Sequence, residues 1–366
     1  MQPKTYFSLF ACFFISLVFQ AQAQVRWVIK PKYNELGSFS EGLASVTIQY
    51  EKGYINKQGQ LVIPAKYRDA YGFSNGLAKV SVNQKDGFID KKGKEVIPCI
   101  YDLVFLPQEG LIAAQKQGKW GFINLQGKVV VPFQYSGALS FTEGLAAVKL
   151  NGKWGYINKT GKVVIPFIYE AARHFWKGRA KVKSRGRQGA IDSTGKVVVH
   201  LRFEQIKLHT SGNTFVKLKG KWGIIDSKGK VVIPIKYDDI GVTRDNKLIM
   251  AGLNNRYGFI NAQGQQIIPF KYLQVFDFTN GLAAVRDQSF LWGFINEKGR
   301  LVIPIKYQLV WSFRGKLASV QLNDKWGFIN HQGKVVVPIQ FDDVNNFYNR
   351  FATVKFKGKW GVIKKP

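Results

Sequence analysis

The chain has 366 residues, 46% of them hydrophobic, and a formal net charge of +31. The hydrophobic share is enough for a packed core and excludes an intrinsically disordered chain. Beyond the first two dozen residues, no stretch approaches the roughly 18 unbroken apolar residues of a membrane helix, so no transmembrane segment is predicted there. So large a positive excess repels itself and attracts polyanions.

The N-terminal residues have the pattern of a secretory signal peptide. Lys4 precedes an almost continuous apolar run from Phe7 to Phe19, and Ala21-Gln22-Ala23 follows as a small-residue cleavage site. An uncleaved anchor is the alternative, but the run is short for a span and no stop-transfer pattern follows. We predict a signal peptide over residues 1–23, with the mature chain secreted, periplasmic or at the cell surface. Cleavage leaves Cys99 as the lone cysteine, so no internal disulfide is expected.

The mature chain, residues 24–366, is periodic. Glycines that precede two apolar residues recur every 34 or 35 residues, at Gly53, Gly87, Gly121, Gly155, Gly189, Gly223, Gly258, Gly293, Gly327 and Gly361. A fixed period over the whole mature chain predicts about ten tandem units in a single array. Six of these glycines follow a tryptophan: Trp120, Trp154, Trp222, Trp292, Trp326 and Trp360.

Each unit is predicted to be an antiparallel β-meander. In one copy, residues 145–150 form a first strand, Asn151-Gly152 a tight turn that needs positive φ at both residues, and residues 153–158 a second strand. A turn from Asn158 to Gly161 leads to a third strand, which Pro166 is expected to stop. A short fourth strand near the following Tyr-Asp position is an option. Because the second and third strands are apolar on both faces, neighbouring units are expected to cover each sheet.

The two ends of the mature chain complement each other. Residues 27–33 have a third-strand sequence without a second strand before it, and residues 359–363 have a second-strand sequence without a third strand after it. This gives nine whole units and one split between the termini. Pairing of the two ends would remove two unpaired sheet edges. We therefore predict an all-β, propeller-like closed toroid, with an open or superhelical array as the alternative.

The recurring motif K-W-G-F-I-N-x-x-G-K-x-V-I-P-x-x-Y resembles the WG (KWG) repeat family of bacterial proteins over nearly the whole mature chain. The resemblance implies an extracytoplasmic or modular β-repeat array and supplies no catalytic residues. Units without the tryptophan, and His200 in place of the usual proline, depart from the motif.

No catalytic, cofactor or metal motif is apparent. The four histidines, His174, His200, His209 and His331, lack zinc-ligand spacing. A nucleophile formed by Cys99 and a distant histidine stays open. The acid pairs Asp238-Asp239 and Asp342-Asp343 have calcium or glycosidase chemistry as one interpretation. Adjacent strand residues point to opposite faces, however, and the pairs share one repeat position, so a turn preference is favoured.

The tryptophan-glycine step has two interpretations. A row of tryptophans is able to stack on sugars or bases. We favour a packing role, in which the indole lies between units with its N–H bonded to a backbone carbonyl, and the glycine allows close backbone approach. The predicted structural core is therefore Trp120, Trp154, Trp222, Trp292, Trp326 and Trp360 with Gly121, Gly155, Gly223, Gly293, Gly327 and Gly361.

Lysine provides the functional signal, because it recurs at fixed positions that a repeat array aligns into rows. The first row precedes the tryptophan position: Lys119, Lys153, Lys221, Lys325 and Lys359. The second follows the turn glycine: Lys94, Lys128, Lys162, Lys196, Lys230 and Lys334. The third precedes the tyrosine: Lys32, Lys66, Lys236, Lys271 and Lys306. Solubility and protection of sheet edges explain lysines at turns, but not why acids fail to balance them. The first and third rows are the predicted binding residues.

Three functions are compatible with these observations. The favoured one is a non-enzymatic extracytoplasmic binding or scaffold protein whose lysine rows engage a polyanion, such as anionic polysaccharide, lipopolysaccharide or nucleic acid, or an acidic envelope protein. The second is a polysaccharide hydrolase or lyase with a site in a central groove, sought first in the irregular unit between Arg173 and His209. The third is a structural spacer or protein-interaction module, which would expose an apolar patch.

Overall fold

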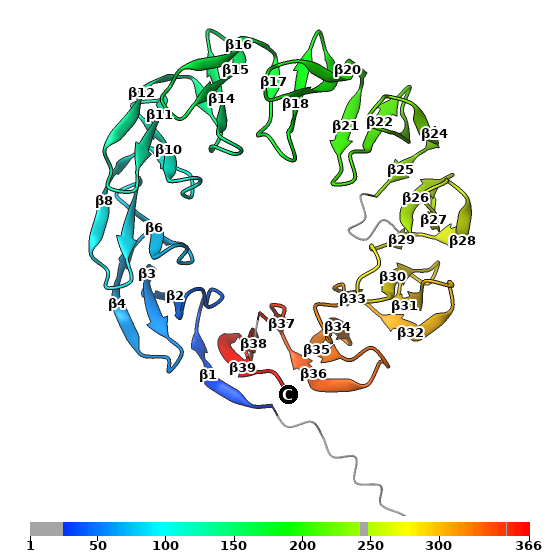
Figure 1. The fold of residues 1–366 in the computed structure, drawn as a ribbon. Coiled ribbons are helices and arrows are strands. Elements are labelled where there is room, and N and C mark those ends of the chain that lie inside the picture. Colours follow the sequence, from blue (N-terminus) through cyan, green and yellow to red (C-terminus); the bar gives the residue numbers. More distant parts are fainter. Residues whose placement is uncertain (1–24, 242–247, 349) are drawn as a thin grey trace, which may run out of the picture.

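The computed structural model describes residues 25–241, 248–348 and 350–366; the predicted signal peptide lies outside them. The described residues form 39 β-strands and no helix. They therefore contain no helix that could cross a membrane. The strands make ten antiparallel sheets arranged around a ring (Figure 1). The molecule is a ten-bladed β-propeller, and the predicted all-β closed toroid is confirmed over the open array.

Each blade repeats the predicted meander, and nine of the ten add a short strand on the inner side, whereas the β2-β3-β4 blade has three strands (Figure 1). The short strands are β5(Asp69–Ala70), β9(Leu103–Val104), β13(Gly137–Ala138), β17(Ala171–Ala172), β21(Gln205–Leu208), β25(Asp239–Ile240), β29(Gln274–Val275), β33(Leu309–Val310) and β37(Asp343–Val344). The first strands are β2(Leu43–Ile48), β6(Leu77–Val82), β10(Leu111–Lys116), β14(Leu145–Leu150), β18(Arg179–Ser184), β22(Thr214–Leu218), β26(Ile249–Leu253), β30(Leu282–Arg286), β34(Ala318–Leu322) and β38(Phe351–Phe356).

The second and third strands complete each blade, with the third strand outermost (Figure 1). The second strands are β3(Glu51–Asn56), β7(Lys85–Asp90), β11(Lys119–Asn124), β15(Lys153–Asn158), β19(Arg187–Asp192), β23(Lys221–Ile225), β27(Arg256–Ile260), β31(Trp292–Asn296), β35(Lys325–Ile329) and β39(Lys359–Lys364). The third strands are β1(Trp27–Tyr33), β4(Leu61–Tyr67), β8(Glu95–Tyr101), β12(Val129–Tyr135), β16(Val163–Tyr169), β20(Val197–Phe203), β24(Val231–Tyr237), β28(Gln266–Tyr272), β32(Leu301–Tyr307) and β36(Val335–Phe341).

The ring closes through a blade shared by the two ends of the described chain. Strand β1 pairs antiparallel with β39, in the order β1-β39-β38-β37. Ile29 lies opposite Val362, and Tyr33 lies opposite Trp360. We call the contact between this blade and the β2-β3-β4 blade the seam. The pairing gives the second strand of the last unit the third strand that it lacks in sequence.

The hydrophobic core lies between the blades. Ten clusters of buried residues each join two successive blades. In one, Trp120 and Phe122 of one blade pack with Ala138 and Val148 of the next. At the seam, Ile29 and Val362 pack with Val46 and Ile55 in the same way. Both faces of each sheet are therefore covered by neighbours, which explains the two-sided apolar second strands.

The third strand differs from the prediction at its proline. Strand β16 continues through Pro166 to Tyr169 instead of stopping. A β-bulge accommodates the proline, because Trp154 lies opposite Tyr169 while Tyr156 lies opposite Ile165. As the outermost strand, β16 has no further neighbour in its sheet that needs the missing N–H.

The first residues of the third strand also differ from the prediction. Val163 and Val164 are 46% and 40% exposed, whereas Ile165 is 1% exposed. The same pattern recurs at Val129-Val130, Val231-Val232 and Leu301-Val302. Only the third residue of each apolar run reaches the core, so this part of the perimeter is apolar and open to solvent.

Candidate functional site

The tryptophan-glycine step lies in the core between blades. Trp120, Trp222, Trp292 and Trp326 are buried, and Trp154 and Trp360 are half-buried. Trp120 packs against Phe105 of its own blade with ring centroids 4.9 Å apart. These positions leave little indole surface for stacking a ligand.

The indole N–H of Trp292 differs from the prediction. Its Nε1 is buried without a hydrogen-bond partner instead of donating to a backbone carbonyl. The ring instead stacks on Phe276, with centroids 4.8 Å apart and planes 20° apart. Its orientation is therefore set by aromatic packing rather than by a polar contact.

The glycine of the step lies against the bulge of the third strand. A Cβ at Gly121 would lie 2.6 Å from the carbonyl oxygen of Val131, and one at Gly155 would lie 2.6 Å from that of Ile165. Equivalent backbone contacts of 2.4–2.7 Å recur at the other glycines of the period. Glycine is required here by close backbone approach, as the sequence indicated.

The groups considered for catalysis do not converge in the structure. Among the described residues, no group of three or more His, Cys, Asp and Glu side chains is placed to hold a metal ion. His209 is buried with Nδ1 2.9 Å from Ser211 Oγ, and the ring of His331 stacks on Phe313. Burial raises the pKa of the Cys99 thiol to about 11. The thiol is therefore protonated near neutral pH and is a weak nucleophile.

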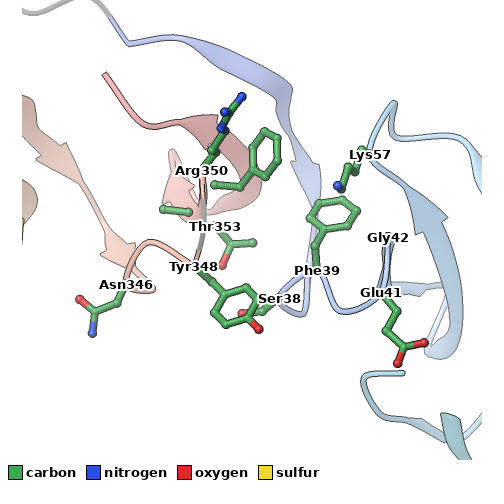
Figure 2. Close-up of a pocket in the computed structure, with 11 residues that line it drawn as sticks. Ser38, Phe39, Glu41, Gly42, Lys57, Asn346, Tyr348, Arg350 and Thr353 are labelled. Atoms are coloured by element: carbon green, nitrogen blue, oxygen red, sulfur yellow. The ribbon is translucent and has the colours of Figure 1, made fainter. Parts of the chain in front are cut away.

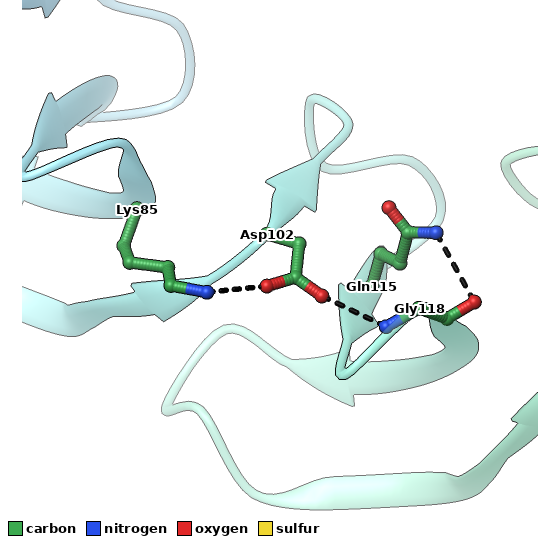
Figure 3. A network of polar contacts seen from close by, with 4 residues as sticks. All are labelled: Lys85, Asp102, Gln115 and Gly118. Atoms are coloured by element: carbon green, nitrogen blue, oxygen red, sulfur yellow. Dashed lines mark hydrogen bonds and ion pairs between the residues drawn. The ribbon is translucent and has the colours of Figure 1, made fainter.

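The acid at the Tyr-Asp position links two blades. Asp102 lies between β8 and β9, where one carboxylate oxygen lies 2.5 Å from Lys85 Nζ of the preceding blade. The other oxygen accepts a 2.9 Å hydrogen bond from the backbone N–H of Gly118 in the next blade (Figure 3). Gln115 Nε2 in turn donates to the Gly118 carbonyl. We call this arrangement the hairpin clamp, because it holds the turns that join first and second strands.

The acid pairs repeat the hairpin clamp. Asp238 pairs with Lys221 and accepts from Asn254 N–H, and Asp342 pairs with Lys325 at 2.6 Å and accepts from Gly358 N–H. Their neighbours Asp239 and Asp343 accept local bonds from the next backbone N–H in the chain. The arrangement therefore supports a structural use of these acids.

A second set of acids links blades on the opposite rim. Glu41 accepts a 3.1 Å bond from Gly76 N–H of the next blade and pairs with Lys91 at 2.9 Å. Glu109 repeats both contacts with Gly144 N–H and Lys159, each at 3.1 Å. Recurrent acids on both rims are thus engaged in blade-to-blade contacts.

The hairpin clamp predicts a specific acid sensitivity. The pKa of Asp342 lies below its ordinary 3.8 because Lys325 Nζ and Gly358 N–H both donate to the carboxylate. A carboxyl whose pKa is lowered by folding stabilises the fold above its unfolded-state pKa, and that contribution is lost as the pH falls through the folded-state pKa. Acidification below 3.8 is expected to lower the melting temperature less steeply in Asp342→Asn than in wild type.

Thermal unfolding followed from neutral pH into the acid range checks this expectation. Asp343→Asn is the matched control, because it removes the adjacent acid, whose carboxylate accepts a hydrogen bond from Val344 N–H within its own blade. Equal acid slopes for wild type and Asp342→Asn would contradict the clamp.

The ten predicted binding lysines are exposed and share one rim. Because Trp222 lies opposite Tyr237, the preceding residues Lys221 and Lys236 lie at the same end of their blade. We call this end, which holds the turns between first and second strands, the hairpin rim. The first and third rows occupy eight of the ten blades at this rim. Of the other two blades, β5-β6-β7-β8 carries Lys85 there, and β17-β18-β19-β20 carries Arg187 and Arg202.

The lysines differ in their partners. Lys221 and Lys325 are held by the hairpin clamp, and Lys359 Nζ donates to Asn34. The third-row lysines each place Nζ 5.0–5.5 Å from the ring centre of the following tyrosine. No described acid forms an ion pair with a third-row lysine. The second row lies on the opposite rim, which we call the loop rim.

A cavity of about 590 Å³ lies at the seam on the loop rim. Tyr348, Arg350 and Thr353 line one wall, and Phe39 and Lys57 line the other (Figure 2). These residues are not among the candidate site residues predicted from the sequence. The missed signal was positional, because Tyr348 stands where other units have Ser40, Ser74 or Thr142, and Arg350 stands where they have Gly42, Gly76 or Gly144.

Comparison with known families agrees with the repeat geometry. The family described as WG containing repeat matches ten stretches of the chain, at residues 26–49, 53–85, 87–120, 120–154, 154–187, 189–222, 222–257, 257–288, 292–326 and 326–360. The chain belongs to this family. No curated protein shows a significant match to this WG-repeat chain.

Solved structures resemble the WG-repeat propeller at low identity. The crystal structure of a eukaryotic initiation factor has a TM-score of 0.53 and 11% identity, covering 90% of this chain and 99% of that chain. The computationally designed Ika8 protein has a TM-score of 0.39 and 10% identity, with coverages of 93% and 99%. BamB from Moraxella catarrhalis has a TM-score of 0.38 and 11% identity, with coverages of 82% and 97%. Similarity at this level concerns fold alone.

Proposed function

We propose that this WG-repeat propeller is a non-catalytic scaffold that binds polyanions through the lysines of its hairpin rim. The observation that supports the proposal is that acidic and basic side chains have different partners. Recurrent acids form clamps between blades, while the third-row lysines are exposed without a described acidic partner. Charge repeated around a ring favours a long ligand that contacts several blades at once.

The proposed setting is outside the cytoplasm, in keeping with the signal-peptide pattern of residues 1–23. Polyanions available there include acidic polysaccharide, lipopolysaccharide and extracellular nucleic acid. N-terminal sequencing of the exported protein should begin at Gln24. An intact N-terminus on the exported protein would overturn the predicted cleavage.

A binding panel tests the proposed function. The chain from Gln24 onward is titrated with an anionic polysaccharide, lipopolysaccharide and nucleic acid at low salt, and each ligand is followed for degradation. The proposal expects at least one class to bind, with no ligand cleaved and affinity falling steeply as salt rises. Absence of binding to all classes at low salt would overturn it, and cleavage of a polysaccharide would favour a hydrolase or lyase.

A protein-interaction role is the second candidate, favoured by the exposed apolar residues of the third strands. Val163, Val164, Val231 and Leu301 are each at least 40% exposed on the perimeter. Burial of such residues by a protein partner would be driven by the hydrophobic effect and would depend weakly on salt. Salt-insensitive capture of an envelope protein, abolished in Val163→Ser/Leu301→Ser, would support this role instead.

A further inference from the structure

The seam cavity departs from the repeat in both size and charge. Tyr348 and Arg350 replace small residues at the inner turn, and Tyr348 is 61% exposed. The other blades show what this turn requires, because Ser40, Ser74 and Thr142 make the same short bridge that Tyr348 makes to Phe351. A large aromatic and a cation are therefore not needed for the turn. The position of Tyr348 varies among units, with Gln108, Trp176 and Arg314 in three others, whereas Arg350 replaces a recurrent glycine. Departures from a repeated residue are expected at functional sites.

The cavity is positively charged as well as aromatic. Lys57 and Arg350 line it from opposite sides of the seam, and neither forms an ion pair with a described acid. Its lining acid, Glu41, is neutralised by Lys91 at 2.9 Å and by the N–H of Gly76. The charge that faces a ligand is therefore cationic.

Small polar side chains complete the lining. Ser38, Asn346 and Thr353 belong to the lining. Thr353 Oγ1 accepts a 2.7 Å hydrogen bond from Asn345 Nδ2, and Asn346, whose Oδ1 accepts a 3.0 Å bond from Ser319 Oγ, lies at the edge of the cavity (Figure 2). Such groups both donate and accept hydrogen bonds, as the hydroxyls of a sugar ring also do. Tyr348 adds an exposed aromatic face, against which the C–H face of a sugar ring is able to pack.

A second cavity continues the same surface. It has a volume of about 770 Å³ and shares Asn346 with the seam cavity. Trp311, which is 53% exposed, and Arg314 line it, so an aromatic and an arginine again lie together. Arg314 also occupies the inner-turn position of Tyr348, where Ser40, Ser74, Thr142 and Thr279 stand in four other units. Two adjoining cavities of similar chemistry suit successive units of a chain.

We infer that the seam cavity is a binding site for an acidic oligosaccharide, with Arg350 and Lys57 receiving a sugar carboxylate and Tyr348 supporting the ring. Arginine matches a carboxylate because its planar fork donates two parallel hydrogen bonds. Trp311 and Arg314 then receive a neighbouring sugar. This site is on the loop rim and is separate from the lysine rows of the hairpin rim.

The lining favours a sugar over nucleic acid. Proteins that bind single strands without sequence preference stack bases on aromatic side chains along a cationic groove, and Tyr348 and Trp311 with their arginines share that chemistry. The seam cavity differs in adding the short hydroxyl side chains of Ser38 and Thr353 beside Tyr348. This composition fits a polyhydroxylated ring that carries one negative group.

Calorimetric titration of the chain from Gln24 onward tests the inference with three matched probes. These are a short oligomer of galacturonic acid, its methyl-esterified and therefore neutral counterpart, and an oligodeoxythymidylate of equal length. The double variant Tyr348→Ser/Arg350→Gly introduces the residues found at these positions in other units, so the turn is expected to fold. Trp176→Ser is the control, because Trp176 is an exposed aromatic at the same position as Tyr348 in a distant blade.

The inference expects the acidic oligomer to bind better than both other probes. Tyr348→Ser/Arg350→Gly should weaken that binding by about tenfold or more, as expected when a charge-assisted hydrogen bond and a packing contact are removed. Trp176→Ser should leave it within about twofold. Equal affinity of the double variant, or preference for the oligonucleotide or the neutral ester, would overturn the inference. Failure of the hairpin-rim proposal would appear separately, as absent binding of long polyanions.

Discussion

Gly121→Ala is expected to lower the free energy of unfolding by about 1–3 kcal/mol, as overpacking of a tight interior does. The added Cβ would lie 2.6 Å from the carbonyl oxygen of Val131, which is backbone and has no rotamer to change. Relief requires the bulge of β12 to move away from β11, where Trp120 and Phe122 are paired with it. Those residues belong to the core between two blades, so the strain reaches both.

Gly72→Ala is the matched control for this prediction. Its Cβ would lie 3.4 Å from Ser40 Cβ, an ordinary contact, and its φ is not in the left-handed region. The change should alter stability by less than about 1 kcal/mol. Denaturant unfolding of both variants measures the difference. A Gly121→Ala protein as stable as Gly72→Ala would show that the glycine is not required by the bulge.

Ile29→Asp is expected to open the ring at the seam. Ile29 is 4% exposed and packs with Val46, Ile55 and Val362 across the two blades that meet there. An unpaired carboxylate in this core is costly enough to displace β1, and its displacement leaves the edge of β39 unpaired. Small-angle scattering should then show a larger radius of gyration, and thermal unfolding should begin at a lower temperature.

Val28→Asp is the control on the same strand, because Val28 is exposed and is not among the residues of the seam core. It should keep the radius of gyration of wild type. If Ile29→Asp folded to a ring of unchanged size and stability, closure through β1 would not be what holds the ends together.

The closed ring was predictable because the sequence signals for strands and turns recur in every unit. Each unit presents the same strand and turn signals, and the split unit leaves complementary ends at Trp27–Tyr33 and Lys359–Lys364. The course of β16 past Pro166 was not predictable by the same reasoning. A proline lacks the backbone N–H whether it ends a strand or lies in a β-bulge, so the sequence does not distinguish the two. The pairing of Trp154 with Tyr169, which shows that the strand continues, is visible only in the structure.

The candidate sites also combine features that the sequence predicts with features that only the structure shows. Rows of lysine follow from the period, but the carboxylate of Asp102 reaches Lys85 and Gly118 of two different blades, a contact that sequence spacing does not define. Tyr348 and Arg350 depart from an inner turn that recurs as Ser/Thr-x-Gly-Leu in other units, and this short motif was not among the signals used to predict a site. Their importance became apparent only when the ends of the chain met at the seam.

The salt dependence of polyanion affinity tests the central claim most directly. Two variants with the same reduction in charge are compared with wild type, one with glutamine at Lys32, Lys66, Lys236, Lys271 and Lys306, and one with glutamine at Lys94, Lys128, Lys162, Lys196 and Lys230. For a nucleic acid ligand, the slope of log affinity against log salt should fall by about 0.7–0.9 for each phosphate that a lysine no longer neutralises. This fall is expected for the hairpin-rim variant, and a wild-type slope is expected for the loop-rim variant. Equal slopes in all three proteins would contradict the claim.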